Sequence, residues 1–590
     1  MNESWKGRPR RRTPASLRCA AGLAIAVAFA ACGDGGGPVG SPGGRDGLDL
    51  VYATPRLRVV PTDGLRRVRI GLIVRREAAD GGSAPLPDAR LVVVREEGQG
   101  VPAAEVVVTG PEGLASVDVE MPPTPDLTRV VVRMEDDAGS YLPFDIVSAP
   151  VVETDLEPGE IVDRLDLPKG GAIVRFRLDA DADVILIPYE TDPDRSGASY
   201  RILFQGTTPG PAAAAFGADE PRLPQALAPR GEAGDVIEAA AGDRRVLRPA
   251  AVPQSLDIAS CMVSASRKAP LRYLGTRIAL YVDAPAGAHQ ARIDSIGRAF
   301  DERIYPRNAE LFGVASDLDG NGVVFVVMTP ELRDVDGVYC DSIRRVGTEA
   351  LFLTWDADHP LDRVLATLTH EHQHLINATH HVKSDGNVGD ERWVNEGLSL
   401  AAEALHGYWR ESLIRMWEFL NGQNGGLSML PLDYVPAFDN RYMAFFLYLE
   451  DRFGTGTLKA LSTSGRRGID NVEFVTGMAF EDLVRDWFVA LAVSNRGITD
   501  EARYSYRSID LMGMTDEIAE CECSPVETFT GMRLEPLHLT TTFDVSRMLD
   551  RSDADYYRLL PPEGSGVTTY DVYFDAFGRE FVELAAARVR

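Results

Sequence analysis

The sequence predicts a multidomain protein in which an α+β domain, with a mixed sheet and a helical half, is flanked by all-β sandwich-like modules. The chain contains 590 residues, which is too long for one hydrophobic core, since most domains contain about 100–150 residues. Short β-branched runs separated by turn residues fill residues 48–205 and 524–590. Between these two regions, apolar residues recur with the spacing of helices and of a few buried strands.

The first 31 residues are expected to be a lipoprotein signal peptide rather than part of a fold. A basic stretch ending at Arg18 precedes an apolar run over residues 19–31, which is too short to span a bilayer. The junction Ala30-Ala31-Cys32 resembles a bacterial lipobox, in which the cysteine is acylated and becomes the mature amino terminus. Residues 32–47 are rich in glycine and would form a flexible tether. We therefore expect an exported bacterial lipoprotein of the outer membrane or cell surface, held to the membrane by a lipid on Cys32; an ordinary signal peptide is the alternative.

The net charge and the cysteines argue against a nucleic-acid-binding protein and against a fold built on disulfides or cysteine-bound metal. A net charge of −27 argues against a nucleic-acid partner, because nucleic acids are themselves polyanions. The remaining cysteines are too few and too scattered to predict a disulfide framework or a cysteine metal site. Their pairing stays open; they are Cys261, Cys340, Cys521 and Cys523.

The flanking segments are expected to be β modules without chemistry of their own. Residues 48–155 alternate in the manner of an immunoglobulin-like sandwich, with Asp-Gly, Gly-Gly and Pro-Pro breaks between the apolar runs. Residues 156–254 form a second β-rich region that ends in an Ala/Pro/Gly-rich linker, and residues 521–590 a C-terminal β module. Nothing in residues 48–155 converges on chemistry, so this first module is expected to be a spacer rather than a binding site.

The central domain is expected to span residues 255–520. Buried strands are predicted from β-branched apolar runs, and helices from apolar residues spaced three and four apart. The predicted strands are residues 277–282, 323–328 and 351–354; the predicted helices are residues 290–308, 360–382, 390–406, 408–420, 441–453 and 480–493.

An acidic loop precedes the second of these strands. Asp317, Asp319 and Asn321 stand at the first, third and fifth positions of a sequence that begins like a calcium-binding loop. The twelfth position, where a bidentate Glu closes such a site, is Met328. Since Asp, Asn and Gly also make tight turns before strands, the loop is either a turn or a Ca²⁺ site, and the turn is favoured.

The most informative stretch is His370-Glu371-His372-Gln373-His374. It places two imidazoles one helical turn apart on one face, as two ligands of a single metal ion require. Glu371 projects about 100° around the helix, beside such a metal, where a general base for activated water belongs. His372 points away from the other two imidazoles, so it is expected to be packed or solvated, and His380 and His381 to be helix-end cations or surface groups.

The next predicted helix supplies a third ligand and a supporting carboxylate. Two histidines leave a tetrahedral zinc ion in need of one more protein ligand and an open position. Glu396 follows after a loop and can return to the level of the two histidines. Glu403 lies two turns further along the same face and can hydrogen-bond the far nitrogen of a ligand histidine, most plausibly His370. Gly397 inside this helix costs about 1 kcal/mol relative to Ala, and close approach of this helix to the preceding one, residues 360–382, would explain its presence.

At these residues the chain resembles the gluzincin metallopeptidases. The Trp-Val-Asn-Glu-Gly block at 393–397 and Glu403 match that group, and residues 316–322, 374–377 and 442–454 extend the resemblance to the hyicolysin family of bacterial extracellular peptidases. The resemblance covers about residues 270–460. It implies a zincin-like catalytic domain in which His370, His374 and Glu396 bind one Zn²⁺ and Glu371 is the base. It also implies a Tyr that stabilises the transition state, for which Tyr442 stands in the expected place and Tyr434 is the rival.

The sequence thus predicts an exported, zinc-dependent peptidase that acts on a protein or peptide. One alternative is a catalytically silent adhesion or scaffold lipoprotein that keeps the fold; another is a zinc hydrolase of a non-peptide substrate. Glu371 argues against the silent alternative, because a protein that only binds has no physical need for a carboxylate beside the metal.

Overall fold

The computed structural model describes residues 48–205, 252–512 and 536–590, apart from internal gaps. The signal peptide, the tether, Cys32, most of the 206–254 linker, Tyr434 and the four later cysteines lie outside the described residues. No helix within the described part of the chain is both long enough and apolar enough to cross a membrane. The gaps are residues 53–56, 63–66, 78–82, 125, 137–139, 170, 180–181, 258–267, 284–288, 333–334, 340–348, 382–389, 409–415, 417–418, 421–428, 431–438, 539–541, 561–568 and 577–580.

The first module is a pair of sheets that share one hydrophobic core, as the alternating pattern predicts. In β3 the side chains of Val68, Ile70, Leu72 and Val74 are buried, because every second residue of a strand faces the same side. One sheet has the order β1 (Leu48–Tyr52), β3 (Arg67–Glu77), β8 (Leu114–Glu120) and β6 (Val101–Pro102), with β4 (Ser83–Pro85) beside β3. The other has the order β2 (Leu57–Pro61), β10 (Tyr141–Ala149), β9 (Asp126–Met134), β5 (Arg90–Glu97) and β7 (Val106–Val108).

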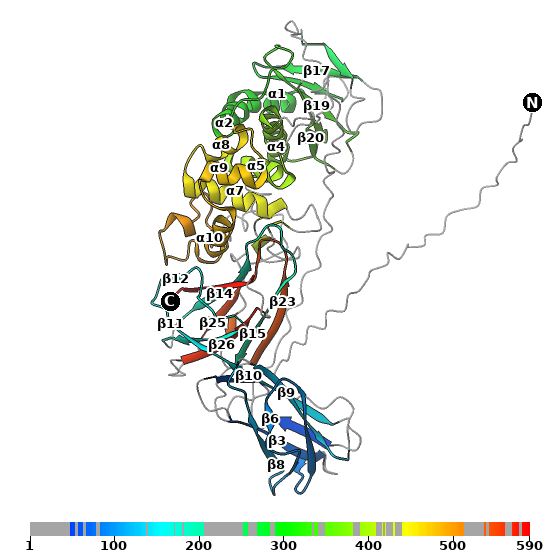
Figure 1. Ribbon diagram of the computed structural model, residues 1–590. Helices are drawn as coiled ribbons and strands as arrows, with labels where there is room; N and C mark the ends of the chain where they lie inside the picture. Colours follow the sequence, from blue (N-terminus) through cyan, green and yellow to red (C-terminus); the bar gives the residue numbers. More distant parts are fainter. Residues whose placement is uncertain are drawn as a thin grey trace, which may run out of the picture. The chain divides into compact units, whose positions relative to one another are not determined.

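A second pair of sheets corrects the predicted domain boundaries. We expected residues 156–254 and 521–590 to form separate β units, but their strands pair with one another, so the cyan and red segments lie side by side in Figure 1. One sheet has the order β11 (Val151–Asp155), β13 (Ala172–Arg177), β26 (Thr569–Asp575), β15 (Ala198–Gln205) and β23 (Thr542–Leu549). The other has the order β12 (Ile161–Val162), β27 (Glu583–Arg588), β14 (Val184–Glu190), β25 (Tyr557–Leu560) and β22 (Pro536–His538), with β24 (Asp553–Ala554) beside β14.

The reason for the difference is physical. A period of two tells which face of a strand is buried but not which strand lies next to it. Strand β14 is buried at every position, so it needs neighbours on both edges and cover on both faces. The chain supplies those neighbours from almost 400 residues away, where Tyr189 pairs with Glu583 and with Ala554.

The central domain has the predicted mixed sheet. Its order is β16 (Ser255–Asp257), β17 (Lys268–Leu274), β18 (Ile278–Val282), β19 (Val324–Thr329), β21 (Ala350–Thr354) and β20 (Gly337–Tyr339). The β18–β19 and β19–β21 pairs are parallel and the other pairs antiparallel. β18 and β19 are buried throughout, as strands in the middle of a covered sheet must be.

Helices cover this sheet and build a second core beyond it. The predicted 290–308 helix is α1 (Gln290–Ala299), a π-helical turn η1 (Phe300–Ile304) and α2 (Tyr305–Leu311) in succession. The predicted 408–420 helix lies mainly outside the described residues. The other helices are α4 (Leu361–His380), α5 (Arg392–Leu405), α7 (Asp439–Phe453), α8 (Thr457–Thr463), α9 (Gly468–Thr476) and α10 (Phe480–Val493), with a short 3₁₀ turn η3 (Ala502–Tyr504).

Helix α4 belongs to both cores. Val364, Leu368 and Leu375 pack with the sheet and with α1, whereas Ile376 packs with the helices that follow. A helix covered on both sides is held firmly, so side chains on it are placed with little freedom. This is the helix that carries the two predicted metal ligands.

Candidate metal centre

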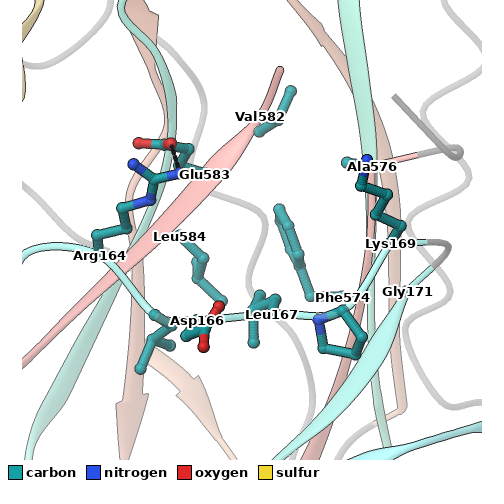
Figure 2. Close-up of a pocket in the computed structure, with 12 residues that line it drawn as sticks. Arg164, Asp166, Leu167, Lys169, Gly171, Phe574, Ala576, Val582, Glu583 and Leu584 are labelled. Carbon is teal, nitrogen blue, oxygen red and sulfur yellow. Dashed lines mark ion pairs between the residues drawn. The ribbon is translucent and has the colours of Figure 1, made fainter. Parts of the chain in front are cut away.

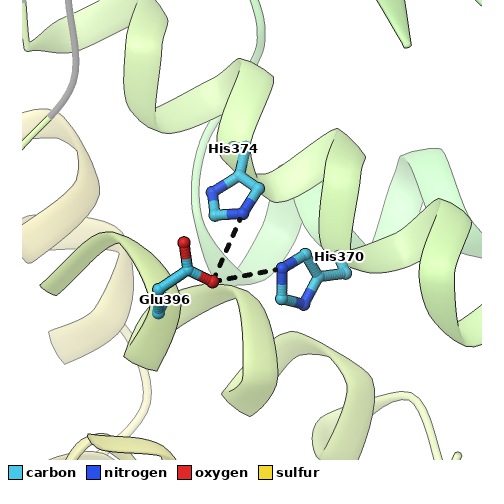
Figure 3. Close-up of side chains that lie close together, drawn as sticks. All are labelled: His370, His374 and Glu396. Atoms are coloured by element: carbon cyan, nitrogen blue, oxygen red, sulfur yellow. Dashed lines mark ion pairs between the residues drawn. The ribbon is translucent and has the colours of Figure 1, made fainter. Parts of the chain in front are cut away.

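Two imidazoles of α4 meet as the i, i+4 spacing requires. The ring centroids of His370 and His374 are 4.6 Å apart, and the two residues are only 8% and 7% exposed. Their side chains leave the same face of the helix and approach α5 (Figure 3).

Glu396 on α5 completes the group. Its Oε2 lies 3.5 Å from Nε2 of His370 and 3.7 Å from Nε2 of His374 (Figure 3). Gly397 lets α5 approach α7 closely, because a Cβ at this position would lie 2.4 Å from Cδ2 of Phe446 and 2.8 Å from Cβ of Tyr442. The close approach expected from this glycine was to the preceding helix, α4; the atoms nearest to such a Cβ belong instead to α7.

The far nitrogen of His370 meets the carboxylate that the spacing predicts. Nδ1 of His370 lies 2.7 Å from Oε1 of Glu403, and both residues are buried. An ionised carboxylate can only accept hydrogen bonds, so the imidazole donates its Nδ1–H and keeps its lone pair on Nε2. The contact between Glu403 and His370 is as expected; its effect on metal affinity stays a prediction.

The corresponding partner of His374 is a residue that sequence reasoning missed. Oγ of Ser399 lies 3.0 Å from Nδ1 of His374 and donates to Oε1 of Gln373 at 2.5 Å. Since the single hydroxyl proton is used towards Gln373, Ser399 accepts the Nδ1–H of His374. The available signal was the spacing: Ser399 follows Glu396 by three residues and so shares its helical face.

The donor set fits zinc. Zinc bonds to His nitrogen and carboxylate oxygen are about 2.0–2.1 Å long, so tetrahedral ligand atoms lie about 3.3–3.4 Å apart. The observed separations of 3.5 and 3.7 Å from Glu396 are close to this, and the three ligand atoms lie within 4.8 Å of one another. Because each Nδ1 is engaged elsewhere, both Nε2 lone pairs are available to one ion. His370, His374 and Glu396 therefore suit a zinc ion.

The electrostatics of the group favour a bound cation. Burial lowers the pKa of His370, but hydrogen bonds to Glu396 and Glu403 outweigh it and raise that pKa well above its usual value. Burial raises the pKa of Glu396, but His374 and His370 outweigh it and lower that pKa to about 2. The carboxylates thus attract positive charge strongly, and a divalent metal would supply it in place of protons.

The two residues predicted for catalysis, Glu371 and Tyr442, are both buried and each lies against a glycine of a neighbouring element. Glu371 is 5% exposed and its carboxylate lies beside Gly337 of β20. Tyr442 is 4% exposed and its Cβ lies against Gly397. Burial raises the pKa of Tyr442 to about 12, with Glu396 among the nearby charges. Its role as transition-state donor stays a prediction.

The remaining histidines of α4 have structural partners. His372 is buried, contacts Nδ2 of Asn308 through Nδ1, and packs against the rings of Phe300 and Tyr305. Burial lowers the pKa of His372 to about 3, so it is packed and neutral. The expectation for His381 is wrong in part: it caps α4 through the carbonyl of Asn377, but it is fully buried rather than at the surface.

The acidic loop gathers three carboxylates. Oδ1 and Oδ2 of Asp319 accept hydrogen bonds from the backbone and side chain of Asn321, which is the geometry of a tight turn. Met328, at the twelfth position, lies inside β19 and carries no ligand. Glu349, directly before β21, instead brings its carboxylate within 4.8 Å of Asp317 and Asp319. Calcium binding at this loop stays a prediction, because acidic clusters also occur without an ion.

A separate cavity lies in the second pair of sheets. Its volume is about 190 Å³, and the ion pair between Arg164 and Glu583, 2.8 Å long, lies at its edge (Figure 2). The wall combines apolar side chains, among them Leu167, Phe574 and Leu584, with charged residues such as Asp166 and Lys169. None of the residues predicted from the sequence lines it.

Comparison with characterised proteins supports a metallopeptidase relationship. No protein-family model matches the chain. The neutral metalloprotease ShpI of Staphylococcus hyicus is 27% identical over 180 residues, which are 26% of this chain and 39% of that protein. The chain therefore covers less than half the length of this relative. Together with the group formed by His370, His374 and Glu396, the match relates this chain to the metallopeptidases.

The similar solved structures do not assign a fold or a function to this chain. The D00–D0 domain of intimin matches with 16% identity and a TM-score of 0.15, over 19% of this chain and 51% of that one. A C-terminal fragment of intimin matches with 16% identity and a TM-score of 0.14, over 19% and 36% of the two chains. The secreted serine protease VesC of Vibrio cholerae matches with 8% identity and a TM-score of 0.14, over 27% and 39%. TM-scores this low carry no argument about the fold.

Proposed function

We propose that this chain is a zinc-dependent peptidase of the gluzincin type, with a zincin-like catalytic domain. One observation carries the proposal: His370, His374 and Glu396 direct three ligand atoms to one point, while Glu403 and Ser399 hold the two imidazoles from behind. The base Glu371 follows the first ligand directly and lies outside the ligand set.

The roles follow from this arrangement. His370, His374 and Glu396 would hold a zinc ion, which as a Lewis acid would lower the pKa of water towards about 7. The Glu371 carboxylate would accept a proton from the water as its oxygen bonds to the carbonyl carbon, and would pass that proton to the nitrogen of the leaving amine as the C–N bond breaks. The hydroxyl of Tyr442 would donate to the oxygen of the attacked carbonyl, where negative charge develops.

The sheet edge supports a peptide as the substrate. Among the described residues β20 pairs with β21 alone and is the last strand of its sheet. It also passes beside Glu371. An extended peptide can pair with such an edge through its backbone, which would bring a peptide bond next to the base. This favours a peptidase over a hydrolase of non-peptide substrates.

Mutation should separate the ligands from the base. His370→Ala, His374→Ala and Glu396→Ala each remove a metal bond, so zinc content and hydrolysis of a peptide library should fall together. Glu371→Gln keeps the shape of the side chain and should keep the zinc while hydrolysis falls by at least about 100-fold. If Glu396→Ala kept its full zinc content, a residue other than Glu396 would have to be the third ligand. Zinc-loaded protein of residues 32–590 that cleaves no peptide would instead favour the silent scaffold or a non-peptide substrate.

We further propose that the protein is exported and anchored by a lipid on Cys32, as the basic and apolar segments before this cysteine suggest. Its partners would then be a membrane surface and a protein or peptide substrate. Metabolic labelling with a palmitate analogue should mark the wild-type protein and fail to mark Cys32→Ala. Unchanged labelling and membrane fractionation of Cys32→Ala would rule out this anchor.

A further inference from the structure

One face of α4 lies against β20. Arg363, Thr367 and Glu371 follow one another at intervals of four residues, so they share that face. Arg363 binds Oδ2 of Asp336 through Nε and a terminal nitrogen, at 3.0 and 2.5 Å. Asp336 directly precedes β20, so this ion pair fixes the start of the strand against the helix.

The next residue of the strand lies against the other two side chains. A Cβ placed on Gly337 would lie 2.5 Å from Cγ2 of Thr367, and 2.9 Å from both Cγ and Oε1 of Glu371. Carbon atoms do not approach one another so closely, since interiors are already packed to contact. The strand therefore lies this near to Glu371 only because residue 337 has no side chain.

The neighbouring groups leave little room to adjust. The hydroxyl of Thr367 donates to the carbonyl of Arg363 at 3.0 Å, which fixes its rotamer and keeps Cγ2 towards the strand. Along one edge β20 is paired with β21, where Gly337 is opposite Leu353. Thr354 adds hydrogen bonds to the carbonyls of Asp336 and Val335, at 2.8 and 2.7 Å.

We propose that Gly337 is a positioning residue for Glu371: the bare backbone of β20 forms a wall that holds the carboxylate beside His370, His374 and Glu396. This inference rests on the proposed function, because it assigns the wall a role in placing the base. Any side chain at residue 337 would push the carboxylate out of place without touching a metal ligand.

The contact itself is testable without catalysis, in the full chain. Gly337→Ala should lower Tm. Adding either Thr367→Ser or Glu371→Ala to this variant should recover part of the loss in Tm, because each second substitution removes an atom that the new Cβ meets. Gly275→Ala is the matched control, because its Cβ would lie 2.0 Å from Oδ2 of Asp301 and would not meet Glu371. Its Tm loss should add to that of Glu371→Ala without recovery. Strict additivity of Gly337→Ala with Glu371→Ala would overturn the proposal.

The role is tested by kinetics on the zinc-loaded protein. Displacing a base by about 1 Å lowers the rate by about 100-fold, so Gly337→Ala should lose about 100-fold in kcat while zinc stoichiometry stays unchanged and KM changes little. Adding Thr367→Ser should recover Tm but not kcat, since the contacts with Glu371 remain. Gly275→Ala should keep the wild-type kcat. If the wild type is active and Gly337→Ala is equally active, the positioning role of Gly337 is wrong while the proposed peptidase stands. If the wild type is inactive, the proposed peptidase is contradicted, and the Tm test decides whether Gly337 makes the contact with Glu371.

Discussion

At the scale of single residues, the two imidazoles of the candidate site are held by unlike partners. His370 donates to the ionised carboxylate of Glu403, and His374 to the neutral hydroxyl of Ser399. Hydrogen bonds to charged acceptors are about twice as strong as neutral ones. The carboxylate also raises the basicity of the imidazole, which makes it a better ligand. The two supports should therefore differ in strength.

This asymmetry predicts an order of zinc affinities. Glu403→Gln should bind zinc about 10- to 100-fold more weakly than the wild type, and Ser399→Ala should show a smaller loss, while both variants fold normally. Chelator competition measures the affinities, with Ser462→Ala as the control, because Ser462 is also buried but lies on α8 away from the group. Wild-type affinity in Glu403→Gln would reduce the site to His370, Glu371, His374 and Glu396.

At the scale of elements, the position of Glu396 depends on how closely α5 approaches α7. Two effects oppose each other at Gly397. Alanine is the better helix former by about 1 kcal/mol, but its Cβ would lie 2.4 and 2.6 Å from ring carbons of Phe446. Overpacking of this kind costs about 1–3 kcal/mol. Since both helices are buried where they cross, the contact should outweigh the propensity.

Gly397→Ala is therefore expected to lower the free energy of unfolding by about 1–3 kcal/mol. Zinc affinity should fall as well, because the neighbouring residue is the ligand Glu396. Urea unfolding and chelator competition measure the two effects. The companion variant Gly397→Ala with Phe446→Leu should recover part of both losses, since the smaller side chain gives way. A stabilised single variant would mean that the helices are free to separate.

At the scale of the whole molecule, the second pair of sheets and the helices share a core. Ile187 of β14 and Ala585 of β27 belong to the same buried cluster as Trp487 of α10. The turn before β24 adds polar contacts, because the backbone of Met429 donates to the carbonyl of Ser552 at 2.7 Å. Beside that turn Asp553 and Arg441 are both buried, and Arg441 is the residue before Tyr442. This pair of sheets is thus packed with the helical half.

Asp553 gives this contact a pH dependence. Burial, aided by Asp555, raises the pKa of Asp553 to about 7 against the opposing effects of Arg441 and of the backbone of Asp550 and Ala554. In the unfolded chain an Asp has a pKa of about 3.9. Between these values the folded state holds one more proton than the unfolded state, so the contribution of Asp553 to stability is full below about pH 4 and is lost as the pH rises to about 7.

The expected result is a difference between two curves. From pH 5 to pH 7 the free energy of unfolding of the wild type should fall relative to that of Asp553→Asn, by up to about 1.4 kcal/mol per pH unit. Above pH 7 the difference between the two free energies should level off. Urea unfolding at several pH values measures it. Parallel curves for the two proteins would show that Asp553 does not change its protonation state in this range.

The sequence by itself determined what is local. The spacing of His370 and His374 and the two turns between Glu396 and Glu403 follow from helical geometry alone, and the structure brings these side chains together. The strands at the centre of the α+β domain were equally evident, because continuous β-branched runs have few other places to be buried.

Only the tertiary structure decided what depends on distant segments. The pairing of β14 with β25 and β27, the approach of Glu349 to Asp317, and the contact of Gly337 with Glu371 join residues that no local pattern connects. The helical spacing shows that Ser399 shares a face with Glu396, but the contact of its hydroxyl with His374 forms only because α5 packs on α4. The physical reason is the same in each case: periodicity fixes which face of an element is buried, whereas the packing of the whole chain chooses what that face meets.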